Sequence, residues 1–126
     1  MEKPLKLDPS LPSGVKIFTG HGPGYVVVNG ARQTGVLVVA PDAVRTDWPA
    51  TGFDALQESH FEWLLALKPE LVLLGTGDSQ RFAHPRLTRA LTEAHVGVEC
   101  MTNAAACRSY NILAADGRRV VAALFV

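Results

Sequence analysis

Two glycines and a threonine, Gly75, Thr76 and Gly77, directly follow a run of four apolar residues and are suited to binding an anion. Glycines let a chain leave a strand by a tight turn whose backbone amides stay exposed. An arginine in the loop that follows, and the start of a helix further along the chain, would add positive charge and free N–H groups. These features predict a small-anion or metabolite groove formed by Gly75, Thr76, Gly77, Arg81, Asn103 and Ser109.

A purely structural role is the more common one for the same residues. The Gly-Thr-Gly stretch lacks the third glycine of a dinucleotide fingerprint, because Gln80 stands in its place, so a tight turn is favoured over a cofactor loop. The small residues that follow Asn103 favour close packing of a helix at least as strongly as contact with a ligand. Both interpretations of the turn stay open.

The side chains that most often perform catalysis form no complete set. The histidines are scattered, and no pair of them has the spacing of metal ligands. Cys107 lies near a predicted helix start beside Arg108, but no base is close to it in the sequence, and an ordinary buried thiol is the commoner case. There is no P-loop and no G-x-S-x-G elbow. We therefore expect no metal, no cofactor and no catalytic residue, and favour a protein that is not an enzyme.

The first third of the chain has the pattern of antiparallel β-strands. Asn29-Gly30 follows a β-branched run and predicts a hairpin with a type I′ turn. Pro41 is expected to end a later strand over residues 36–39. Residues 1–14 hold three prolines and a glycine, which predicts an extended lead-in before a single domain over residues 15–126.

The pattern then changes to the period of a helix. Asp54 is expected to cap a first helix, with Gln57 three residues later completing a capping box, and Pro69 ends it. Residues 71–74 then read as a strand buried on both faces. Helices that alternate with strands place the Gly-Thr-Gly turn at the carboxyl edge of a sheet, where ligands usually bind.

Two more helices and two strands, the first of them over residues 96–101, complete the prediction. Pro85 is expected to be the first residue of a second helix. Thr102 or Asn103 is expected to cap a third helix, which ends near Gly117. Residues 120–126 are all apolar and predict a strand in the centre of the sheet. The whole pattern predicts an α/β fold with a mixed sheet and about three helices.

The composition is that of a folded globular protein, with 48% hydrophobic and 19% charged residues. Basic and acidic residues are equal at 12 each, which argues against a partner that is a nucleic acid or a membrane surface. No apolar run is long enough to span a bilayer, and the first residues do not resemble a signal peptide. Two cysteines are too few for a disulfide framework. We expect a cytoplasmic protein.

Three stretches of the sequence, residues 69–77, 106–113 and 117–124, carry a resemblance to a known family. They read PELVLLGTG, ACRSYNIL and GRRVVAAL. Together they resemble a family of domains of unknown function that includes mitochondrial complex I assembly factor 3 and stand-alone bacterial and archaeal proteins. The likeness extends over nearly all of the chain after residue 14 and includes Trp48. Ser109 stands where the pattern commonly has threonine, which keeps the hydroxyl.

The resemblance implies a three-layer α/β fold with a central mixed sheet and a groove near the Gly-Thr-Gly turn. It brings no established reaction. Because the eukaryotic relatives act as assembly partners for a respiratory complex, it implies a non-enzymatic protein-interaction domain that assists assembly of a larger complex. The alternative is a small-anion or metabolite-binding protein, or an enzyme, that uses the groove.

Overall fold

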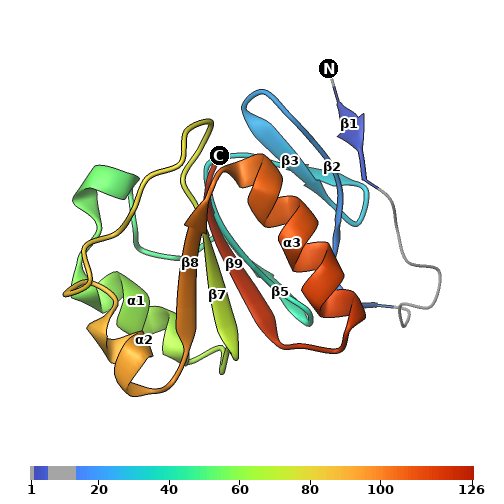
Figure 1. Cartoon of the computed structure of the whole chain (residues 1–126). Coiled ribbons are helices and arrows are strands. Elements are labelled where there is room, and N and C mark those ends of the chain that lie inside the picture. The colour runs from blue at the N-terminus through green and yellow to red at the C-terminus, as the bar shows by residue number, and fades with distance from the viewer. Residues whose placement is uncertain (1, 6–13) are drawn as a thin grey trace.

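The computed structural model describes residues 2–5 and 14–126, and its strands form two sheets (Figure 1). The larger sheet has five strands in the order β6-β5-β9-β7-β8, and the smaller has four in the order β1-β2-β3-β4. Most of the predicted lead-in lies outside the described residues, but Lys3–Pro4 pairs with the smaller sheet as β1. In chain order the elements are β1 (Lys3–Pro4), β2 (Phe18–Gly22), β3 (Tyr25–Val28), β4 (Ala31–Gln33), β5 (Val36–Ala40), β6 (Ala43–Arg45), the 3₁₀ turn η1 (Phe53–Ala55), α1 (Glu58–Leu65), β7 (Leu71–Gly75), α2 (Arg89–Glu93), β8 (Gly97–Met101), α3 (Asn103–Ala115) and β9 (Val120–Phe125).

The larger sheet is mixed, as predicted. Strand β7 runs parallel to both β8 and β9, whereas β5 and β9 are antiparallel. Strand β9 lies between β5 and β7, and its residues from Val120 to Leu124 are fully buried. The predicted central position of the last strand is therefore confirmed.

Two apolar clusters on opposite faces of this sheet define three layers (Figure 1). On one face, Phe61 and Leu64 of α1 and Leu91 of α2 pack with Leu74. On the other face, Tyr110 of α3 belongs to a cluster that also contains residues of β2 and β3. Helix α3 thus lies against the larger sheet and also contacts the smaller one, and the predicted α/β fold is confirmed.

The N-terminal hairpin forms where the sequence predicts it. Asn29 and Gly30 have φ values of 47° and 83°, which a type I′ turn requires. The hairpin belongs to the separate smaller sheet and does not extend the main one. As predicted, the strand before Pro41 ends there: β5 stops at Ala40, and the chain then turns back so that Ala43 pairs with Ala40 to begin β6.

The first helix begins later than predicted. Residues 53–55 form a 3₁₀ turn, and Leu56 is extended with ψ 137°, so helix α1 begins only at Glu58. Gln57 is the N-cap residue, and its backbone N–H donates to Nδ1 of His60 at 3.0 Å. Asp54 caps no α-helix because it lies within the 3₁₀ turn, four residues before α1, and its carboxylate forms an ion pair with Arg81 in a distant loop.

Pro85 is also not the first residue of a helix. Residues 85–88 form turns with i→i+3 hydrogen bonds, such as Thr88 N–H to Pro85 O at 3.3 Å. The Nδ1 atom of His84 accepts from Arg86 N–H at 3.1 Å, which stabilises these turns. Helix α2 therefore starts at Arg89, while α3 has the expected Thr102 cap.

Candidate functional site

The turn after β7 is held by hydrogen bonds that join it to β8, β9 and α3. Thr76 is buried; its N–H donates to Met101 O at 2.8 Å, and its hydroxyl donates to Ser79 O at 2.6 Å. The side chain of Asn103 accepts from Gly77 N–H at 3.1 Å and donates to Phe125 O at 2.8 Å. One asparagine therefore fastens the exits of two strands to the start of α3.

Gly75 is required at this turn by space. A Cβ atom on Gly75 would lie 2.3 Å from Cδ2 of Leu124 and 2.5 Å from Oδ1 of Asn103, closer than such atoms can approach. Gly77 has φ 88°, a backbone conformation that favours glycine. Both glycines thus have structural reasons to be present, whether or not a ligand binds nearby.

The structure brings four of the six predicted groove residues together, namely Gly75, Thr76, Gly77 and Asn103. Arg81 joins the turn only through its backbone N–H, which donates to Thr76 Oγ1 at 3.2 Å. Its guanidinium group lies over the ring of Phe53, 4.2 Å from the centroid, and pairs with Asp54. The hydrogen bond from the Arg81 guanidinium to the Asp54 carboxylate, together with the positive charge of Arg81, lowers the pKa of Asp54. Ser109 lines a different groove, along β8.

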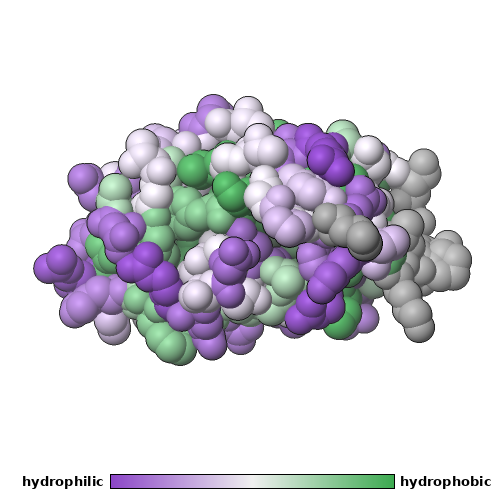
Figure 2. All heavy atoms as spheres, turned by 90° about the horizontal axis from the view of Figure 1, so that it is seen from above, coloured by the Kyte–Doolittle hydropathy of each residue, from purple (hydrophilic) through white to green (hydrophobic). Residues whose placement is uncertain are grey.

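A cavity of about 230 Å³ lies beside the turn, between α3 and the smaller sheet. Gly77, Asn103, Ala104 and His21 are among its lining residues, and the Ala104 N–H donates to no other described residue. The pKa of His21 is lowered, first by burial and then by the positive charges of Arg108 and Lys3. Figure 2 shows apolar atoms near the middle of this end of the molecule, bordered by polar ones. Anion binding at this cavity stays a prediction.

The polar residues in the middle of α3 hold the smaller sheet in place. The side-chain oxygen of Asn111 accepts from Phe18 N–H at 2.9 Å, and its amide donates to Phe18 O at 2.7 Å. The Tyr110 hydroxyl donates to Lys16 O at 2.8 Å, and burial raises the pKa of that hydroxyl. The stretch of residues 106–113 therefore has a clear structural role, which the sequence did not indicate.

The two cysteines are free, and the one in α3 is poorly suited to act as a nucleophile. Cys107 is fully buried, and burial raises the pKa of its thiol to about 12, so it is protonated at neutral pH. Among residues 2–5 and 14–126, no group of three or more His, Cys, Asp or Glu side chains could hold a metal ion.

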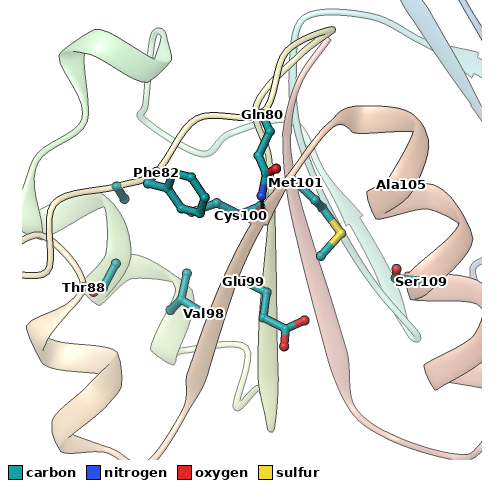
Figure 3. Close-up of a pocket in the computed structure, with 10 residues that line it drawn as sticks. Gln80, Phe82, Thr88, Val98, Glu99, Cys100, Met101, Ala105 and Ser109 are labelled. Atoms are coloured by element: carbon teal, nitrogen blue, oxygen red, sulfur yellow. Dashed lines mark hydrogen bonds between the residues drawn. The ribbon is translucent and has the colours of Figure 1, made fainter.

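A groove of about 580 Å³ follows β8, which is an edge strand of the larger sheet (Figure 3). Phe82 and Val98 lie on one side of the strand, and Met101 and Ser109 lie on the α3 side. Phe82 is 77% exposed, the most of any large apolar side chain in the described chain. Sequence reasoning missed this groove, because no local pattern reveals which strand is at an edge.

No helix in the described part of the chain combines the length and the apolar character needed to cross a bilayer.

An α/β domain with this topology belongs to a class of proteins that is defined by its fold. The chain is a member of the family described as protein of unknown function (DUF498/DUF598), whose model matches residues 18–125. The family resemblance in the sequence is thereby confirmed.

Solved structures with this fold come from several bacteria. A protein from Bordetella parapertussis superposes with a TM-score of 0.84 at 38% identity, covering 90% of this chain and 98% of that one. A Bordetella pertussis protein described as a Mth938-like domain has a TM-score of 0.79 at 32% identity, covering 96% and 92%.

Relatives with similar sequences include named assembly factors. Bovine NADH dehydrogenase (ubiquinone) 1 alpha subcomplex assembly factor 3 is 33% identical over 78% of this chain, which spans only 54% of that relative's length. An uncharacterized protein of Rhodobacter capsulatus is 36% identical over 89% of this chain and 86% of its own.

Proposed function

We propose that this domain is a non-enzymatic interaction module that assists the assembly of a larger protein complex, and that the groove along β8 is its binding surface. The names of its mammalian relatives, which are assembly factors, support this role. The equal numbers of acidic and basic residues support a protein partner over a nucleic acid. Two free cysteines fit the reducing cytoplasm, where we place the protein.

The observation that carries the proposal is the open edge of β8. Among the strands of residues 2–5 and 14–126, β8 pairs with β7 alone, so one side of its backbone has no described strand beside it. Edge strands that are left open are templates for pairing with another chain. Phe82 adds an exposed aromatic side chain next to that edge, and aromatic residues are enriched at protein interfaces.

The experiment that tests the proposal compares the two exposed large apolar side chains of the described residues. A photo-crosslinking amino acid replaces Phe82 in one variant and Ile112 in the other, and each full chain is expressed in cells that make the protein natively. Ile112 is a matched control because it is 65% exposed but lies on α3, beside a different cavity. We expect the variant at Phe82 alone to crosslink to subunits of one multi-subunit complex.

Loss of the protein should also lower the assembled fraction of that complex on native gels. Equal crosslinking from both positions, or normal assembly of the crosslinked complex without the protein, would contradict the proposed function.

A further inference from the structure

We propose that β8 binds an extended segment of the partner by strand addition, and that this segment places a Lys or Arg beside Glu99 with an apolar residue on either side. The inference rests on the proposed function, because it names the chemistry of the partner at the same surface. It follows from the direction of the β8 backbone, the two halves of the groove and the charge of Glu99.

Alternate residues of β8 direct their backbone groups away from the sheet. Met101 O accepts from Thr76 N–H at 2.8 Å, so the backbone N–H and C=O of Met101 point to β7. By alternation, the backbone groups of Glu99 point to β7 as well. Val98 and Cys100 therefore direct their N–H and C=O groups to the open edge. The side-chain amide of Gln80 donates to Cys100 O at 3.0 Å, the bond that a partner's backbone N–H would make. Because Gln80 is exposed, a partner can displace it.

The groove accommodates side chains on both faces of such an added strand. Val98 and Phe82 lie on one side of β8, while Glu99 and Met101 extend to the α3 side (Figure 3). Successive side chains of a strand point to opposite faces. A partner residue beside Glu99 therefore faces α3, and both of its neighbours face Phe82 and Val98, where apolar side chains fit.

Glu99 determines the charge of the partner. Its side chain is exposed and takes part in no ion pair among residues 2–5 and 14–126. Oppositely charged residues beside each other on neighbouring strands stabilise pairing, and like charges weaken it. A Lys or Arg at the position beside Glu99 is therefore favoured over a neutral or acidic residue.

The same carboxylate disfavours a second copy of this chain as the occupant. Suppose that the β8 strands of two copies pair in antiparallel fashion. The outward-facing backbone groups of Val98 and Cys100 can then all form hydrogen bonds only when Val98 of each copy pairs with Cys100 of the other. Glu99 then lies directly opposite Glu99 of the second copy, in a non-hydrogen-bonded pair where side chains are closest. The geometry points to a different protein with a basic residue at this place.

Binding of blocked synthetic peptides to the ¹⁵N-labelled full chain tests this inference. Three peptides share the alternating sequence Thr-Val-X-Val-Thr, with Lys, Ala or Glu at the central position X. For the Lys peptide we expect saturable shifts centred on the amides of Val98 and Cys100. The Ala peptide should bind roughly two- to fivefold more weakly, and the Glu peptide more weakly still.

Two charge reversals make the test specific. Glu99→Lys should invert the order of the three peptides, so that the Glu peptide binds most tightly. Glu62→Lys, at an exposed position on α1, is the matched control and should leave the order unchanged. Gln80→Ala should tighten binding of the Lys peptide, because it removes the group that competes for Cys100 O.

The inference is overturned if the central residue has no effect on affinity, if Glu99→Lys keeps the wild-type order, or if the shifts lie away from β8. None of these results would alter the crosslinking from Phe82, so the interaction role can stand when strand addition fails. If crosslinking fails and the peptides follow the expected order, the assembly role is wrong and the chemistry of the edge is correct.

Discussion

Replacing Gly75 by alanine is expected to destabilise the fold by about 1.5–4.5 kcal/mol, from overpacking at about 1–3 and a disturbed hydrogen bond at about 0.5–1.5. The new methyl group would lie 2.3 Å from Leu124 Cδ2 and 2.5 Å from Asn103 Oδ1. Leu124 is fully buried in the central strand, so it has little room to move. Asn103 would have to weaken its bond to Gly77 N–H.

Urea unfolding followed by tryptophan fluorescence, to which the buried Trp48 contributes together with Trp63, measures this loss. Gly52→Ala is the matched control: Gly52 has extended backbone with φ 178° and no atom within 4 Å of the added Cβ. That variant should unfold within about 0.5 kcal/mol of the wild type.

A double-mutant cycle separates the two clashes. Asn103→Ala alone should cost about 1–3 kcal/mol, because it leaves Gly77 N–H and Phe125 O without their partner. In the double variant with Gly75→Ala the Oδ1 clash is absent, so the combined loss should fall short of the sum by about 0.5 kcal/mol or more. A wild-type stability for Gly75→Ala, or strict additivity, would refute this account of the turn.

Three further predictions concern other parts of the molecule. In the native protein at pH 8, iodoacetamide should modify Cys100 and spare the buried Cys107 until urea is added, and equal labelling of both cysteines would contradict this. Raising the pH from about 9 to 12 should destabilise the fold, because the folded state holds the proton of the Cys107 thiol more tightly than the unfolded chain does. The pKa of His21 measured by NMR should lie below 6.5, and an unshifted pKa would contradict this prediction. Protonation of His21 then favours the unfolded chain, so the stability that this residue contributes is lost as the pH falls below about 6.5. His21→Gln should reduce this dependence of stability on pH. Deleting residues 122–126 should abolish cooperative unfolding, because it removes most of a central buried strand and truncating one such side chain already costs about 2–5 kcal/mol; a cooperatively melting truncation would show that the strand is not needed.

Local signals predicted the elements that depend on neighbours in sequence. The Asn29-Gly30 turn, the Thr102 cap and the buried strand β9 appear where the residues indicate, because turn conformation, capping and continuous burial are set within a few residues. Asp54 illustrates the opposite case. It has the type of a helix cap, but a guanidinium 27 positions away pairs with it, and no local rule includes that contact.

In the candidate site, too, some placements could be predicted from the sequence and others could not. Gly75, Gly77 and Asn103 meet because parallel strands β7 and β8 end at one edge, and the alternation of helices and strands predicted that meeting. Arg81 was assigned to the same groove because it lies in the loop after the turn, and Ser109 because its hydroxyl lies on the third helix, whose start was expected at that edge. Side-chain direction separates them: the guanidinium of Arg81 contacts Phe53, and Ser109 lines the groove beside β8.

The described edge strands differ in how well they are protected, and this difference favours β8 as the binding edge. Strand β6, at the opposite edge of the larger sheet, has three residues, and the outer strands of the smaller sheet have two and three. Short edges offer few backbone groups for pairing. Strand β8 has five residues, no proline and a groove beside it. A charged side chain on an edge strand discourages pairing between copies, and Glu99 is the one charged residue that β8 carries. The residue that keeps this long edge from pairing with itself is thus the one that would select a basic partner segment.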